Sequence, residues 1–240
     1  MTKTTRINSW VMAIGVMALP LLLAMPAPVR AQALWIEGKH YEVIRPAVPT
    51  STPGKVEVVE VFSYGCPYCY QAEPMMQAIA AQLPAKAKLV RVAASFLAGE
   101  AWPMFQRAYY TAQSLGIADK THAAMFEAIW VTGELPLMDP ATKRLMKPLP
   151  TIADAARFYA HHAAVTQGDF IKASQSFAVE TNMRRADELV KAYAIPGTPA
   201  IVINGKYRIG PNPPASEEQM NALIHFLIGL ESRQVPKKAS

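Results

Sequence analysis

The stretch that decides the fold reads Val56-Glu57-Val58-Val59-Glu60-Val61-Phe62-Ser63-Tyr64-Gly65-Cys66-Pro67-Tyr68-Cys69. Its first half is an apolar run rich in β-branched residues, which predicts a buried strand over Lys55 to Phe62. Cys66-Pro67 then fits the start of a helix, because proline is favoured in the first turn, where its missing N–H costs nothing. A C-x-x-C motif therefore lies where a strand ends and a helix begins. It contains both cysteines of the 240-residue chain.

Composition indicates a globular chain with a modest positive charge. Apolar residues make up 51% and charged residues 18%, which suits one large domain or two small ones. The formal net charge is +6, but residues 1–33 contribute Lys3, Arg6 and Arg30 and no acid. The 24 Lys and Arg residues less these three leave 21 against 18 acidic residues, a balance of +3. No basic run remains, so we expect no nucleic-acid partner.

Residues 1–33 have the organisation of a secretory signal peptide. A positively charged start is followed by an apolar stretch, residues 10–25, and then by small residues that allow cleavage after Ala31 or Ala33. The apolar stretch is shorter than the roughly 20 residues that span a bilayer, and Pro20 interrupts it. We therefore predict a cleaved, exported protein, with an uncleaved membrane anchor as the alternative.

The spacing of the two cysteines indicates reactivity rather than a structural role. A disulfide persists in an oxidising compartment, but one that closes so short a loop restrains the unfolded chain little. Disulfide exchange requires a thiolate, and the positive end of a helix dipole stabilises an anion. We expect an exposed attacking sulfur at Cys66 and a shielded resolving sulfur at Cys69, one turn further in. A zinc site is not favoured, because there is no second C-x-x-C motif.

The remaining pattern predicts one sheet whose two halves are separated by helices. Strands are expected near residues 41–44, 88–95, 200–204 and 206–209, and Asn204-Gly205 is a hairpin turn signal between the last two. A final helix, capped by Ser216, runs through Leu230. Between the sheet halves, residues 99–193 carry a helical pattern. The order predicts a βαβ plus ββα core with a helical subdomain inserted into it.

Three details of the helical region can be checked directly. Thr151 with Asp154 three residues later resembles a capping box that begins a helix. Phe177 is expected to face inward from the next helix, and the last helix of the group is expected over Thr181 to Tyr193. His122, like the other histidines in helices, is interpreted as a solvated or core-edge residue.

Several blocks of the sequence resemble the DsbA family of periplasmic thiol:disulfide oxidoreductases. The blocks are the signal-like start, Gly38 to Ile44, Glu60 to Cys69, Ile195-Pro196-Gly197-Thr198-Pro199-Ala200 and Asn204-Gly205-Lys206-Tyr207. The resemblance implies a periplasmic location and an α/β, thioredoxin-like fold with an inserted α-helical subdomain. Its expected parts are a signal peptide (1–33), a first thioredoxin-like part (34–98), the insertion (99–193), a second thioredoxin-like part (194–232) and a polar tail (233–240).

The resemblance also implies roles for individual residues. Thr198 and Pro199 would form a cis-proline loop beside Cys66 that holds an extended substrate peptide, whereas the sequence alone is equally compatible with a trans proline. Glu60 would be the buried acid that helps to move the proton of Cys69, with Arg91 as its basic partner. An outward-facing pair at a strand edge is the alternative.

The middle of the motif departs from the family pattern. The best-known members carry Pro-His, where this chain has Pro67-Tyr68. Histidine can donate a charge-assisted hydrogen bond to the thiolate, whereas tyrosine offers a neutral one. Because Pro-Tyr is also typical of glutaredoxins, the sequence leaves the oxidising strength open.

These residues predict an enzyme that needs no cofactor and donates its Cys66–Cys69 disulfide to reduced exported polypeptides. By family analogy, a quinone-linked inner-membrane protein of the DsbB type reoxidises it, and we expect a monomer. A reductase or isomerase is one alternative, although residues 34–55 are too short for the N-terminal dimerisation domain usual in isomerases. The other is a peptide-binding chaperone with incidental cysteines.

Overall fold

A computed structural model describes residues 1, 2, 35–210 and 212–234, and the chain from Trp35 onward clusters as one compact unit. The predicted signal peptide, residues 1–33, lies outside the described residues apart from its first two. No helix in the described part of the chain is long and apolar enough to cross a membrane. In chain order the elements are β1 (Tyr41–Val43), β2 (Val56–Phe62), α1 (Pro67–Gln82), β3 (Ala87–Ala93), α2 (Trp102–Ser114), α3 (Ala118–Trp130), α4 (Ile152–His162), α5 (Gln167–Ser174), α6 (Phe177–Ala192), β4 (Ala200–Ile203), β5 (Tyr207–Ile209) and α7 (Glu217–Gln234).

The strands form one mixed sheet in the order β1-β5-β4-β2-β3. Strand β2 pairs with β3 in parallel, through the crossover helix α1, and with β4 in antiparallel orientation. β5 continues the sheet antiparallel to β4, and β1 closes its edge against β5. The predicted βαβ plus ββα core is therefore present, and β2 is an interior strand between β4 and β3.

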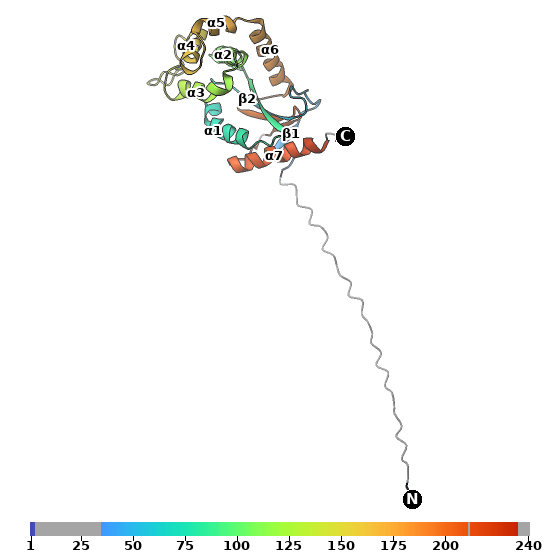
Figure 1. The fold of residues 1–240 in the computed structure, drawn as a ribbon. Helices are drawn as coiled ribbons and strands as arrows, with labels where there is room; N and C mark the ends of the chain where they lie inside the picture. Colours follow the sequence, from blue (N-terminus) through green and yellow to red (C-terminus); the bar gives the residue numbers. More distant parts are fainter. Residues whose placement is uncertain (3–34, 211, 235–240) are drawn as a thin grey trace. The chain divides into compact units, whose positions relative to one another are not determined.

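Helices cover both faces of the sheet, so every residue of β2 is buried. On one face, Val58 packs with Ile79 of α1 and Leu227 of α7 in one apolar cluster. On the other face, Val59 belongs to a larger cluster that extends into the helices between β3 and β4. Figure 1 shows α7 running below the strands, with α4, α5 and α6 on the opposite side. This double coverage fixes the end of β2, from which the chain enters the C-x-x-C motif.

The helices between β3 and β4 run from Trp102 to Ala192, and some of their predicted details are present while others are wrong. The capping box at the start of α4 is present, since the side chains of Thr151 and Asp154 each bond the other's backbone N–H. The predicted inward position of Phe177 is wrong, because its side chain is 78% exposed. Ser176 caps α6 through Val179 N–H, so the helix starts at Phe177 and not at Thr181. A capping hydroxyl decided this boundary, and the apolar pattern did not reveal it.

Helix α7 also continues beyond its predicted end at Leu230. It reaches Gln234, past the boundary expected at residue 232. Glu231 explains the extension, because its carboxylate accepts hydrogen bonds from Asn204 Nδ2 at 2.8 Å and Lys206 Nζ at 3.1 Å. The hairpin turn thus holds the last turn of α7 in place. The sequence pattern predicts that the end of this turn belongs to a polar tail.

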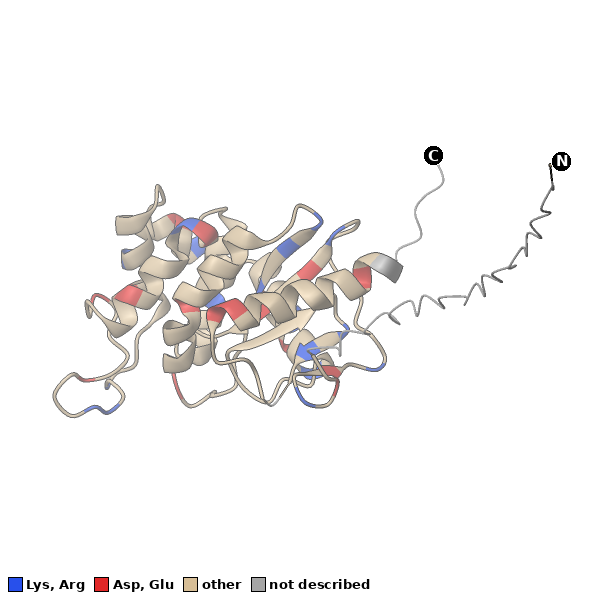
Figure 2. Cartoon of the chain, turned by 90° about the horizontal axis from the view of Figure 1, so that it is seen from below, with Lys and Arg blue, Asp and Glu red and all other residues tan. Residues whose placement is uncertain are grey.

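Charged residues are distributed over the fold in both signs. In the view of Figure 2, acidic and basic positions are interspersed along the elements. Some of them pair within the helical segment, as Arg107 does with Glu180 at 2.8 Å. Residues 34–240 carry a small net positive charge, and charges of both signs spread over the surface favour solubility.

The hairpin between β4 and β5 depends on a glycine. Asn204 and Gly205 both have positive φ, 52° and 64°, as the predicted turn requires. Gly205 also accepts a hydrogen bond from Val48 N–H at 2.9 Å. A Cβ atom at residue 205 would lie 2.0 Å from the backbone oxygen of Val48, which a real side chain cannot do.

We predict that Gly205→Ala lowers the free energy of unfolding by roughly 2 kcal/mol or more, because the clash and the positive φ both oppose a side chain. Gly229→Ala is the matched control, since a Cβ there meets nothing within 4 Å. In the interior of α7 it should stabilise by about 0.5–1 kcal/mol. Urea unfolding of both variants measures this, and equal stabilities would contradict the close approach to Val48.

Candidate active site

The C-x-x-C motif begins at the junction between β2 and α1. Cys66 is the N-cap residue of α1, and Pro67 is in its first turn, as predicted. The preceding turn is held by Cys66 N–H, which donates to Ser63 O at 3.1 Å. Trp130, from α3, donates its indole N–H to Tyr64 O at 3.0 Å. The inserted helices therefore help to fix the backbone that presents Cys66.

The loop before β4 reaches the same point. The Thr198–Pro199 peptide is cis, as the family resemblance implied. The thiol of Cys66 donates to the carbonyl oxygen of Thr198 across 3.3 Å, although the residues are 132 positions apart. Packing of β4 against β2 brings this loop to the motif. Pro199 itself is exposed beside the sulfur.

The predicted exposure of Cys66 is wrong. In this dithiol form the residue is 4% accessible, and Cys69 is 1% accessible. The contact with Thr198 closes over the Cys66 sulfur, which sequence reasoning could not anticipate. Pro67 and Tyr68 are exposed, and Tyr68 is 67% accessible. The motif therefore presents its middle dipeptide to solvent and keeps both sulfurs behind it.

The two sulfurs have opposite acidities. A hydrogen bond from the Cys69 thiol is the largest cause that lowers the pKa of Cys66 to about 6, and the Thr198 side chain and the backbone of Tyr68 and Cys69 add to it. Burial opposes this but is outweighed. Burial also raises the pKa of Cys69 far above its usual range, and the neighbouring Cys66 raises it further. One sulfur is thus ready to be a thiolate near neutral pH, and the other remains a thiol.

Glu60 and Arg91 form the pair that the family resemblance implied. They lie directly opposite each other on β2 and β3, and Arg91 Nε donates to Glu60 Oε2 at 3.0 Å. The pair is not at a solvent-facing edge, because the side chains are 2% and 13% accessible. Burial is the main cause that raises the pKa of Glu60 to about 7, although Arg91 acts in the other direction.

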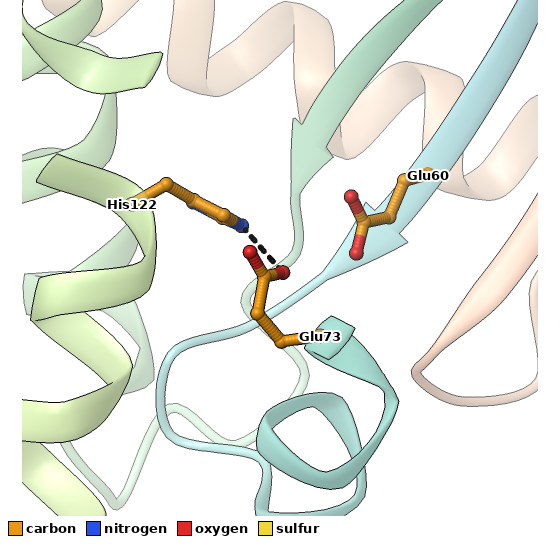
Figure 3. A group of neighbouring side chains, drawn as sticks. All are labelled: Glu60, Glu73 and His122. Atoms are coloured by element: carbon orange, nitrogen blue, oxygen red, sulfur yellow. Dashed lines mark ion pairs between the residues drawn. The ribbon is translucent and has the colours of Figure 1, made fainter. Parts of the chain in front are cut away.

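Two residues that sequence reasoning missed join this pair. Glu73 on α1 and His122 on α3 are both buried, and His122 Nε2 lies 3.3 Å from Glu73 Oε2 (Figure 3). His122 is therefore a core residue and not the solvated or core-edge residue expected. The spacing of Cys69 and Glu73 was an available signal, because residues four apart in a helix share a face. Nothing in the sequence places His122 beside them.

This cluster has spacing that would suit a cation. Potential ligand atoms of Glu60, Glu73 and His122 lie within 4.8 Å of one another. Arg91 already supplies a positive charge to Glu60, and a metal ion would have to compete with it. One member of the cluster, Glu73, lies one helical turn from Cys69 on α1.

An apolar groove of about 520 Å³ lies next to the cis-proline loop. Its walls include Met75 from α1, Pro199, Ile201 of β4 and Met220 of α7. The groove continues from the exposed proline beside the Cys66 sulfur. The geometry thus combines an activated thiol, a cis-proline loop and an adjoining apolar surface.

Comparisons with known proteins agree on one family. A family model described as DSBA-like thioredoxin domain matches residues 57–220. The thiol:disulfide interchange protein DsbA of Azotobacter vinelandii is 37% identical over 194 residues, which is 81% of this chain and 83% of that protein. The solved structure of the oxidoreductase DsbA from Xylella fastidiosa is 30% identical, has a TM-score of 0.73, and is matched over 84% of this chain and 100% of that one. That of Proteus mirabilis DsbA with a non-covalently bound peptide is 26% identical, with a TM-score of 0.63 and coverages of 82% and 98%.

We predict that Cys69→Ala raises the pKa of Cys66 from about 6 toward the ordinary thiol value, because the Cys69 thiol is the largest stabilising influence on the Cys66 thiolate. Thiolate absorbance followed against pH measures it directly. Cys66→Ala serves as the control and should show no thiolate below the pH where free cysteine ionises. An unchanged midpoint in Cys69→Ala would assign the acidity of Cys66 to the helix N-terminus instead.

The same acidity predicts that the reduced protein melts at a higher temperature than the oxidised protein. A lowered folded-state pKa contributes stability above the unfolded value of about 8.5, and this is lost as pH falls through about 6. A change of the Cys66 pKa from about 8.5 to about 6 corresponds to roughly 3 kcal/mol at pH 8–9. Thermal unfolding of both forms between pH 5 and 9 tests it. If the difference in melting temperature between the two forms does not become smaller toward pH 5, the thiolate is not its source.

Proposed function

The chain belongs to the DsbA family of thiol:disulfide oxidoreductases, and from this membership we propose that Cys66 and Cys69 are the disulfide it donates to other proteins. The protein is a thiol:disulfide oxidoreductase with a thioredoxin-like fold, as its sequence predicted. The opposite acidities of the two sulfurs carry the proposal. They assign a different role to each sulfur in the exchange.

The proposed reaction has two exchange steps. A substrate thiolate attacks Cys66 Sγ in the oxidised enzyme, the bond to Cys69 Sγ breaks, and Cys69 leaves as a thiolate that takes up a proton. A second substrate thiolate then attacks the substrate sulfur of the mixed disulfide. Cys66 leaves as a thiolate, which its low pKa favours. The substrate loses two electrons and the enzyme gains them as the Cys66–Cys69 dithiol.

Glu60 is the proposed source of the proton for Cys69. A thiolate is unstable at Cys69, because burial raises the pKa of this thiol far above its usual range. Glu60 is buried near the end of β2 that leads into the C-x-x-C motif, and its pKa is about 7. It can therefore hold and release a proton at neutral pH. Glu73 follows Cys69 by one helical turn on α1.

Thr198 and Pro199 are the proposed binding site for the substrate backbone. The peptide bound to Proteus mirabilis DsbA supports a peptide ligand for this chain as well. The apolar groove beside Pro199 would take substrate side chains, while the exposed edge of the loop offers backbone hydrogen bonds. Pro67 and Tyr68 border the sulfur that the substrate attacks.

We further propose that the enzyme acts as a monomer in the periplasm, delivered there by residues 1–33. A quinone-linked membrane protein of the DsbB type would remove the two electrons from the dithiol. Disulfide donation is favoured over reduction by the acidity of Cys66, because stabilising the thiolate stabilises the reduced enzyme. This same effect makes the oxidised enzyme the stronger electron acceptor.

We predict that oxidised protein transfers its disulfide to a peptide with two cysteines, and that Cys66→Ala/Cys69→Ala loses this activity completely. Mass spectrometry of the peptide measures the transfer. Given the peptide in its disulfide form, Cys69→Ala should instead form a mixed disulfide, because the Cys66 thiolate breaks the peptide disulfide and releases one peptide thiolate. Transfer that persists in the double variant would contradict the proposal.

The peptide assay also separates the alternatives. An isomerase would rearrange a peptide with a mispaired disulfide faster than it oxidises a reduced peptide. A chaperone would suppress aggregation of an unfolded protein equally well with and without its cysteines. Either result, combined with slow oxidation, would overturn disulfide donation as the function.

A further inference from the structure

Two buried carboxylates close to the redox pair have different surroundings. Glu60 faces the cation Arg91, which also pairs with the exposed Asp119 at 3.2 Å. Glu73 faces His122 and also accepts a hydrogen bond from Gln77 at 2.9 Å. Two carboxylates this close and this buried cannot both ionise without a large cost, so one of them should carry a proton near neutral pH.

The orientation of His122 is set by Tyr64. The Tyr64 hydroxyl lies 2.9 Å from His122 Nδ1, and both side chains are buried. Phe62 and Phe126 hold the imidazole edge-to-face, at ring distances of 4.8 and 5.3 Å. We assign the hydroxyl as the donor to Nδ1, because this places the proton of the neutral ring on Nε2, the atom that faces the Glu73 carboxylate.

The contact between the ring and Glu73 is an ion-pair geometry rather than a well-formed hydrogen bond. His122 Nε2 and Glu73 Oε2 lie 3.3 Å apart, and neither atom has a hydrogen-bond partner among the described residues. Two otherwise unsatisfied buried atoms therefore face each other (Figure 3). With its proton on Nε2, the ring brings a partial positive charge within 3.3 Å of the carboxylate, which favours the ionised form of Glu73.

We propose that His122 is a positioning residue that decides which buried carboxylate carries the proton: by facing Glu73 it keeps Glu73 ionised and leaves the proton on Glu60. This inference rests on the proposed role of Glu60 as the proton source for Cys69. Within the described part of the chain, no hydrogen bond or ion pair joins His122 to either sulfur, so it would act only through the two carboxylates. Its own ionisation is not required.

The acidities agree with this division. Although burial is the largest influence on Glu73 and opposes ionisation, the contacts led by His122 outweigh it and lower the pKa of Glu73 below its usual value. The negative charge of Glu73 is one cause of the raised pKa of Glu60. Burial lowers the pKa of His122 itself, so the ring is neutral at pH 7. The titratable and charged groups around the ring are Glu73 on α1, Glu60 and Tyr64 on and after β2, Arg91 on β3, Tyr109 on α2 and Asp119 on α3.

Carboxyl ¹³C NMR of the purified full-length protein tests where the proton resides. In the unchanged protein we expect Glu60 to titrate near pH 7 and Glu73 below the ordinary range of a glutamate. His122→Phe keeps an aromatic ring for packing but removes the N–H, so Glu73 should titrate above Glu60 and the order should reverse. His122→Gln retains a side-chain N–H donor and should restore the original order. An unchanged order in His122→Phe would overturn the proposal.

A second variant keeps the test decisive if His122→Phe does not fold. Glu73→Gln removes the neighbouring negative charge, so the midpoint of Glu60 should fall by about one pH unit or more. His161→Gln, an exposed histidine paired with Glu134, is the matched control and should change neither carboxylate. An unmoved Glu60 midpoint in Glu73→Gln would refute the coupling on which the proposal depends.

Kinetics then separate this inference from the proposed function. The rate of reduction of the oxidised enzyme by dithiothreitol, divided by the fraction of dithiothreitol thiolate, should decline as Glu60 loses its proton near pH 7. In Glu73→Gln the decline should move to lower pH together with the Glu60 midpoint. If the Glu60 midpoint moves in Glu73→Gln and the order of the two carboxylates reverses in His122→Phe, but the rate profile does not move, proton placement by His122 stands and the role of Glu60 in the exchange fails.

Discussion

The influence of the Cys69 thiol on the neighbouring Cys66 sulfur is the interaction on which the chemistry depends. It couples the two acidities, because the proton that stabilises one thiolate is the proton that the other sulfur retains. The coupling requires both sulfurs to be buried in the same place, at the N-cap of α1 and one turn into it. The carbonyl of Thr198 completes the site from a loop 132 residues away. Burial thus contributes to reactivity here, although it would suppress it at an isolated cysteine.

Burying the polar cluster of Glu60, Glu73 and His122 costs free energy that an apolar core would not. Glu60, Glu73 and His122 are each almost inaccessible, and buried carboxylates are stable only with partners. Arg91 supplies one partner and the imidazole supplies another. Because these two partners differ in charge, the carboxylates differ in acidity. A pair with split acidities can hold a proton at neutral pH, which a fully ionised or fully neutral pair cannot do.

The helices between β3 and β4 are part of the site and not a separate module. Helix α3 contributes Trp130, which bonds the backbone of the turn before Cys66, and His122, which meets Glu73. Their apolar side chains share one cluster with Phe62 and with Cys66 itself. The inserted helices therefore form one side of the active site. This explains why the chain from Trp35 onward forms one compact unit.

The sequence by itself determined what depends on neighbours along the chain: the strand that leads into Cys66, the helix that begins at Pro67, the capping box at Thr151 and the turn at Asn204-Gly205. Each is set by local backbone preferences within a few residues. The inference that Glu60 and Arg91 pair relied on family resemblance.

Only the tertiary structure decided how distant segments complete the site. The burial of Cys66, the encounter of Glu73 with His122 and the anchoring of α7 through Glu231 each join residues that no local pattern relates. Such contacts depend on how the sheet and helices pack as a whole, because the energy of a buried polar group is set by what surrounds it in space and not by its sequence neighbours.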